Sequence, residues 1–111
     1  MLENKTMLVT GGSRGIGAQI VRRAMEEGAQ VAFTYKGSTE IAARLSQELT
    51  ALYSGQTCTA YQCDVADTDA MQSLVATVLQ ELGHLDVLVN NAGITRDVML
   101  VRRCAASPSR C

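Results

Sequence analysis

Hydrophobic and polar positions follow two different periods in alternate segments of this chain. Short, mostly apolar runs predict strands, whereas apolar positions at i, i+3, i+4 and i+7 predict amphipathic helices. The helical period is clearest at Met71, Leu74, Val75, Val78, Leu79 and Leu82. The pattern predicts strands at 5–10, 30–35, 57–62 and 87–90, and helices with their caps at 14–27, 38–52 and 67–82.

Residues at the segment ends support these boundaries. Ser38 and Asp67 carry side chains that can cap a helix N-terminus, and Gly28, Gly55 and Gly83 stand where the helices end. Strands that alternate with helices of this length build βαβ units, in which the strands lie parallel. We therefore predict a single α/β domain with a parallel sheet.

The composition fits one globular domain, because 47% of the 111 residues are hydrophobic and the formal net charge is −1. No basic excess indicates nucleic acid or an anionic membrane, so neither is expected as a partner. No apolar run reaches the roughly 18 residues that a membrane-spanning helix needs. The first residues, which include Glu3 and Lys5, lack the apolar core of a signal peptide, so a cytoplasmic location is expected.

The four cysteines, Cys58, Cys63, Cys104 and Cys111, contain no Cys-x-x-Cys pair, and no metal site is predicted. In a cytoplasmic protein they are expected to be reduced thiols, with Cys58 and Cys63 packed on or beside a strand. The single histidine, His84, follows a glycine that ends a helix. We expect it to face solvent and to complement the dipole of that helix.

The most informative motif is Thr-Gly-Gly-Ser-Arg-Gly-Ile-Gly at 10–17, between the first predicted strand and helix. Glycine tolerates the positive φ of a sharp turn, and its missing Cβ lets a ligand approach the backbone. The free N–H groups of the following helix attract phosphate. The spacing, Thr-Gly-x-x-x-Gly-x-Gly, differs from Gly-x-Gly-x-x-Gly and from the P-loop. The same glycines would also suit a tight turn that binds nothing.

Three further motifs follow the later strands: Cys-Asp-Val at 63–65, Asp-Val-Leu-Val-Asn-Asn-Ala-Gly at 86–93 and Ile-Thr-Arg-Asp at 94–97. Together with the glycine motif they resemble the short-chain dehydrogenases/reductases, a Rossmann-type family that binds NAD(H) or NADP(H). The amino-acid sequence of residues 90–97 is particularly similar to that of the 3-oxoacyl-[acyl-carrier-protein] reductase branch. The resemblance covers roughly residues 5–102. It implies a doubly wound sheet of about four strands in the order 3-2-1-4, with the cofactor across the carboxyl ends of strands 1 and 4.

The resemblance also implies roles for individual residues. Asp64 would accept a hydrogen bond from the adenine amino group, and residues 91–93 would line the adenosine ribose. Asn90 is expected to brace the end of the fourth strand. The complete predicted cofactor site is Gly11, Ser13, Arg14, Gly15, Ile16, Gly17, Lys36, Asp64, Val65, Asn91, Ala92 and Gly93.

Charge at the end of the second strand predicts which cofactor is preferred. An NAD site usually places Asp or Glu about 20 residues after the glycines, to hold the ribose 2′-hydroxyl. Here the strand ends in Thr34-Tyr35-Lys36, and Arg14 supplies a second cation. Two cations would pair with the 2′-phosphate of NADP, so we predict NADP(H) in preference to NAD(H). The alternative is that Lys36 is simply a solvated loop residue.

In the resembling family the reaction needs a Tyr-x-x-x-Lys pair on a later helix. The tyrosine protonates the substrate carbonyl, and because its ordinary pKa is about 10 it needs a nearby lysine. Tyr35, Tyr53 and Tyr61 are followed four positions later by Thr, Thr and Val. No catalytic residue can therefore be assigned, and we expect these 111 residues to bind dinucleotide without transferring hydride.

Residues 103–111 depart from the family, in which an amphipathic helix is expected. We predict that 1–102 form the N-terminal part of a dinucleotide-binding domain and that 103–111 are an irregular tail. The tail resembles the end of a truncated or frameshifted product, and a natural disordered tail is the alternative. The edge of the fourth strand is then expected to lie open.

Two functional hypotheses follow. The first is the NADP(H)-binding part of a 3-oxoacyl-[acyl-carrier-protein] reductase of fatty acid biosynthesis. The full-length family would imply an acyl-carrier-protein substrate and a homo-oligomer. The second is a nucleotide-binding module without catalysis, which acts as a sensor or as a partner subunit.

Overall fold

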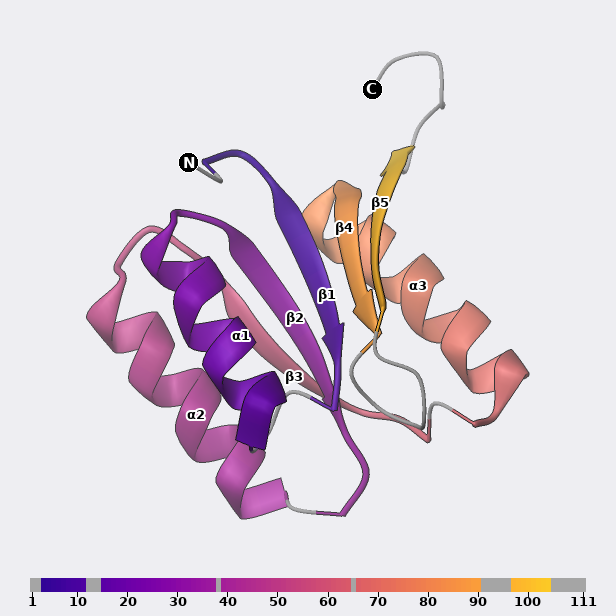
Figure 1. Cartoon of the computed structure of the whole chain (residues 1–111), viewed down its shortest axis with the longest axis horizontal. Coiled ribbons are helices and arrows are strands. Elements are labelled where there is room, and N and C mark those ends of the chain that lie inside the picture. Colours follow the sequence, from indigo (N-terminus) through magenta and orange to yellow (C-terminus); the bar gives the residue numbers. More distant parts are fainter. Residues whose placement is uncertain (1–2, 12–14, 38, 65, 91–96, 105–111) are drawn as a thin grey trace.

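Strands and helices alternate along the chain in the computed structural model (Figure 1). The structure describes residues 3–11, 15–37, 39–64, 66–90 and 97–104. The helices are α1 (Gly15–Glu26), α2 (Thr39–Leu52) and α3 (Thr68–Leu82). The strands are β1 (Thr6–Thr10), β2 (Gln30–Tyr35), β3 (Cys58–Gln62), β4 (His84–Asn90) and β5 (Asp97–Cys104).

The strands form one sheet in the order β3-β2-β1-β4-β5. The first four run parallel, which confirms the predicted Rossmann-like α/β fold and the order 3-2-1-4. β1 lies at the centre, where Val9 pairs with Phe33 of β2 on one side and with Val89 of β4 on the other. The chain adds β2 and β3 on one side of β1 and then continues with β4 on the other side. The order of the strands therefore reverses between β1 and β4.

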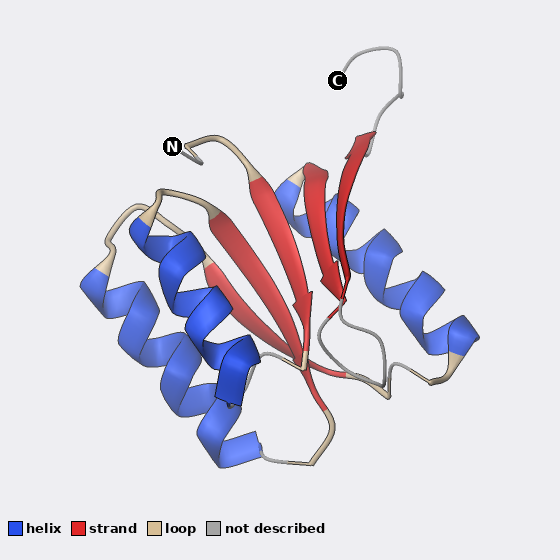
Figure 2. Cartoon of the chain, in the orientation of Figure 1, coloured by secondary structure: helices blue, strands red, loops and turns tan. Residues whose placement is uncertain are grey.

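Helices cover both faces of the sheet (Figure 2). α1 and α2 pack against Met7, Val9 and Phe33, whereas α3 packs against Leu8 and Leu85. Every residue of β1 is buried, because successive side chains point to opposite faces and both faces are covered. The strand therefore reads as a continuous apolar run with threonines at its ends.

The fifth strand corrects two expectations from the sequence. β5 pairs antiparallel with β4, so the edge of β4 is not open, and β5 includes Arg103 and Cys104, which were assigned to an irregular tail. Residues 91–96 between the two strands are too few for a parallel crossover, which needs a dozen or more residues. An antiparallel return is the pairing that so short a connection allows.

Capping residues define α3 as the sequence predicted. The Asp67 carboxylate accepts a hydrogen bond from the Ala70 N–H at 3.2 Å. At the other end Gly83, with φ of 89°, donates its N–H to the Leu79 carbonyl at 2.9 Å. The predicted capping residue of α2, Ser38, lies outside the described residues.

Replacing Asp67 with Ala is expected to lower the free energy of unfolding by about 0.5–2 kcal/mol, because the first turn of α3 loses its capping acceptor. Urea denaturation followed by circular dichroism measures this change. Asp67→Asn is the matched control, since the amide oxygen still accepts the Ala70 N–H. An equal loss of stability in both variants would contradict the capping role.

His84 does not lie at the exposed end of a helix, where the sequence predicted it. β4 begins at His84 itself, directly after Gly83, so the imidazole belongs to the sheet and not to the end of α3. Its Nδ1 lies 2.6 Å from Oδ2 of Asp86, and the same oxygen accepts the Thr6 N–H at 2.9 Å. The side chain is only 33% exposed. The pair connects the first residues of β1 and β4, at the edge opposite the glycine turn.

Among the described residues, none of the helices combines the length and the apolar character that crossing a membrane requires.

Candidate functional site

The carboxyl ends of β1 to β4 meet at one edge of the sheet (Figure 1), because the four strands run parallel. In open α/β sheets a ligand binds at this edge, at the point where the strand order reverses. Half of the predicted site falls on described residues, which are Gly11, Gly15, Ile16, Gly17, Lys36 and Asp64. The other predicted residues lie outside them, namely Ser13, Arg14, Val65, Asn91, Ala92 and Gly93.

Two glycines of the motif, Gly11 and Gly15, have the backbone conformation that the sequence predicted. Gly11 and Gly15 have φ of 66° and 64°, in the left-handed region that favours glycine. The Gly11 N–H donates to the hydroxyl of Thr34 on β2 at 2.9 Å, which connects the turn to the neighbouring strand. Among the residues that the structure describes, none has an atom within 4 Å of a Cβ added to Gly15. The described residues therefore leave open space beside the first residue of α1.

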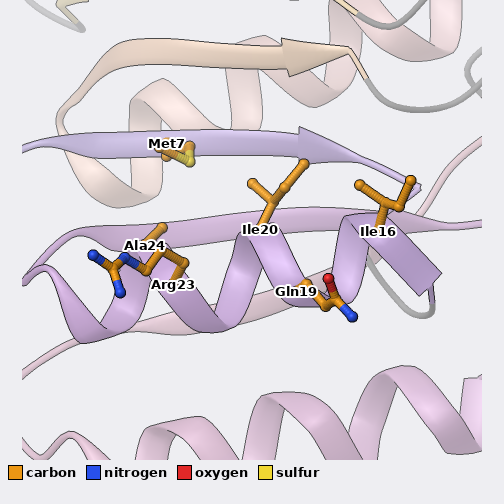
Figure 3. Close-up of a pocket in the computed structure, with 6 residues that line it drawn as sticks. All are labelled: Met7, Ile16, Gln19, Ile20, Arg23 and Ala24. Atoms are coloured by element: carbon orange, nitrogen blue, oxygen red, sulfur yellow. The ribbon is translucent and has the colours of Figure 1, made fainter.

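The other two described residues of the motif lie within α1. Gly17 is buried, as is expected of a glycine that lets a helix pack closely on its strand. Ile16 is 49% exposed, and its side chain borders an apolar groove between α1 and β1 (Figure 3), which is also lined by Met7, Gln19, Ile20, Arg23 and Ala24. This groove has the wrong chemistry for phosphate, so any cofactor contact of Ile16 would use its backbone.

Lys36 follows directly after β2, and its Nζ lies 3.8 Å from Oδ2 of Asp64 after β3. Two further bonds join the same loops. The Gln62 amide donates to the Lys36 carbonyl at 3.3 Å, and the Cys63 N–H donates to the Tyr35 carbonyl at 3.0 Å. The predicted 2′-phosphate cation and the predicted adenine acceptor are therefore neighbours, which their separation in the sequence did not show.

Asp64 is fixed by its own turn. Its Oδ1 accepts the Ala66 N–H at 3.0 Å, and its backbone carbonyl accepts the Asp67 N–H at 2.9 Å. The side chain is 51% exposed, and the second oxygen, Oδ2, lies on the side of Lys36. One oxygen therefore maintains the turn that leads into α3, while the other remains available for a cation or for a donor on a ligand.

Two threonines for which the sequence predicted no role support the site. Thr10 and Thr34 are the last or next-to-last residues of their strands, and both are buried. The Thr10 hydroxyl donates to Oδ1 of Asn90 at 3.1 Å, which agrees with the expected bracing role of that asparagine. The signal that could have identified both residues is a threonine at the carboxyl end of a mostly apolar strand, directly before a predicted ligand loop.

The described residues with perturbed acidity are poor candidates for catalysis near neutral pH. Burial raises the pKa of the Cys58 thiol to about 12. Burial, a hydrogen bond to Glu81 and the charge of that carboxylate raise the pKa of Tyr61 to about 12. Both groups therefore stay protonated. The part of the chain that the structure describes also contains no cluster of His, Cys, Asp and Glu able to hold a metal ion.

Comparison with known proteins places this geometry in a family. A family model described as short chain dehydrogenase matches residues 5–107. The 3-oxoacyl-[acyl-carrier-protein] reductase FabG of Staphylococcus aureus (strain N315) is 47% identical over 102 residues, which cover 92% of this chain and 41% of that protein. The chain thus spans less than half the length of this curated relative.

Solved structures agree with that assignment. A short chain dehydrogenase from Burkholderia cenocepacia J2315 in complex with NADP is 48% identical, with a TM-score of 0.79 over 84% of this chain and 37% of that one. A blue fluorescent protein from a metagenomic library, in complex with NADPH, is also 48% identical, with a TM-score of 0.78 over 84% of this chain and 38% of that one.

Proposed function

Because the chain belongs to the short-chain dehydrogenase family, we propose that the carboxyl edge of its sheet binds NADP(H). The observation that carries this proposal is the space beside Gly15 that no described residue fills, at the start of a helix whose first N–H groups lack partners within the helix. A phosphate group fits such a position, because the backbone donors and the helix dipole both favour negative charge.

The predicted residues would contact different parts of the cofactor. Gly11 and Gly15 would form the turn that leaves room for the pyrophosphate, with Ser13 and the cationic Arg14 between them in sequence. Lys36 would pair with the 2′-phosphate, and Asp64 would accept from the adenine amino group. Val65, Asn91, Ala92 and Gly93 would line the adenosine. The bound cofactor supplies the hydride in this family, whereas the residues of this chain supply binding and orientation.

The preference for NADP(H) is supported by charge at the end of β2. Lys36 is 81% exposed and stands where an NAD site usually carries an acid. The exposed ammonium can thus reach an added phosphate, and its counter-ion, Asp64, is itself half exposed. The two solved relatives in complex with NADP and NADPH support the same choice.

Replacing Lys36 with Asp is expected to weaken NADPH binding by about tenfold and to leave NADH the tighter ligand, since a carboxylate repels the 2′-phosphate and accepts from a 2′-hydroxyl. Fluorescence titration at fixed low salt measures both affinities. Lys5→Asp makes the same charge change at the opposite edge of the sheet, beside the first residue of β1, and serves as the control. Equal affinity of the parent chain for NADPH and NADH would overturn the proposal.

We further propose that the full-length protein reduces a 3-oxoacyl thioester on acyl-carrier protein in fatty acid biosynthesis, as a homo-oligomer. The support is the 47% identity to the Staphylococcus aureus reductase. The second candidate, a nucleotide-binding module without catalysis, is favoured by one observation: none of the three tyrosines within these 111 residues is followed four positions later by lysine. Reductase activity distinguishes the two, as argued in the Discussion.

A further inference from the structure

We propose that Asp64 competes with the 2′-phosphate of the cofactor for Lys36, and thereby sets how strongly this site discriminates NADP(H) from NAD(H). The inference rests on the proposed function, because it concerns the same site. Asp64 then has a role that is separate from any contact with adenine. It is the counter-ion from which Lys36 must dissociate in order to bind the 2′-phosphate.

The geometry restricts where the Lys36 ammonium can be. Its Nζ lies 3.8 Å from Oδ2 of Asp64, and two hydrogen bonds join the loops that carry the two residues. The Gln62 amide fixes the Lys36 carbonyl, and the Cys63 N–H fixes the Tyr35 carbonyl. With both backbones tied, the lysine side chain remains within reach of that carboxylate.

The carboxylate is held in place as well. Because Oδ1 of Asp64 accepts the Ala66 N–H at 3.0 Å, the side chain cannot rotate away without losing this hydrogen bond. A 2′-phosphate that binds to Lys36 therefore meets a fixed negative charge beside its cation. The neutral 2′-hydroxyl of NAD(H) meets no such repulsion, so Asp64 lowers the affinity for NADP(H) alone.

A double-mutant cycle tests this competition. The parent, Asp64→Asn, Lys36→Met and the double variant are titrated with NADPH and with NADH at low salt. The asparagine keeps an oxygen for the Ala66 N–H, so the turn is preserved. We expect Asp64→Asn to raise the ratio of NADPH affinity to NADH affinity about two- to fivefold, the range typical of an exposed ion pair, because any loss of the adenine contact weakens both cofactors alike and cancels in the ratio. The gain should shrink sharply in the Lys36→Met background and at high salt.

Asp67→Asn is the matched control, because it removes an equal charge three positions away and keeps the α3 cap. If it raises the ratio of NADPH affinity to NADH affinity as much as Asp64→Asn does, the effect is general and the inference is wrong. The inference also fails, while the proposed function stands, if Asp64→Asn weakens both cofactors equally or gives the same gain without Lys36. A parent chain that does not prefer NADPH to NADH overturns the proposed function and this inference with it.

Discussion

Replacing Gly15 with Val is expected to abolish NADPH binding while leaving the chain folded. The residue has φ of 64°, a conformation that a β-branched side chain adopts only with strain of about 1–3 kcal/mol. The valine methyl groups would also occupy the open space beside the start of α1, where a phosphate would approach the backbone. Fluorescence titration measures the binding, and circular dichroism shows whether the helices persist.

Gly55→Val is the control that distinguishes two effects of Gly15→Val, namely the loss of space for the ligand and the strain in the backbone. Gly55 has φ of 92° and open space around its missing Cβ, so valine is strained there as well. It lies between α2 and the start of β3, at the edge of the sheet opposite the glycine turn. We expect Gly55→Val to lower stability and to leave NADPH affinity unchanged. If Gly15→Val binds NADPH as well as the parent, the glycine motif is only a structural turn.

A polypeptide of these 111 residues is expected to show no measurable NADPH-dependent reduction of a 3-oxoacyl thioester. General acid catalysis contributes roughly 10²–10⁴-fold, and no Tyr-x-x-x-Lys pair is present to supply it. The pKa is raised for Cys58, Tyr61 and Cys63, so these groups stay protonated and cannot replace it. The decrease in NADPH absorbance with and without substrate measures the rate.

A chimera provides the positive control for this experiment. In the Staphylococcus aureus reductase, the matching segment would be replaced by the aligned residues of this chain, which are 47% identical to it. We expect the chimera to turn over and its Gly15→Val form to be inactive. A chimera that binds NADPH but remains inactive would favour the non-catalytic module. Substrate-dependent turnover by the 111-residue polypeptide alone would show that the assignment of no catalytic residue is wrong.

Local patterns in the sequence were sufficient to predict every described helix and strand except β5, together with most of their ends. The range 30–35 was predicted for β2 and is observed without change, and α3 is capped by Asp67 and Gly83 as expected. These features depend on periodicity and on capping chemistry, which involve residues close together in the chain. The positive φ of Gly11 and Gly15 belongs to the same class, because a strand that turns at once into a helix requires it.

Errors arose where a distant segment decides the outcome. The sequence placed the start of the fourth strand at residue 87, but β4 begins at His84, because Asp86 binds both that imidazole and the N–H of Thr6, 80 residues away. The fifth strand was missed for the same reason. Whether residues 97–104 form a strand depends on the free edge of β4 and on the shortness of the connection, which periodicity within the segment cannot show.

The sequence by itself determined the α/β alternation, the glycine turn and the cation after the second strand, because each depends on residues that are close together in the chain. Only the tertiary structure decided that Lys36 and Asp64 face each other at 3.8 Å, and that Thr34 holds the Gly11 N–H. Parallel pairing brings strand ends together from segments more than 20 residues apart, and side-chain charges act over a few ångströms of space, whatever their separation along the chain.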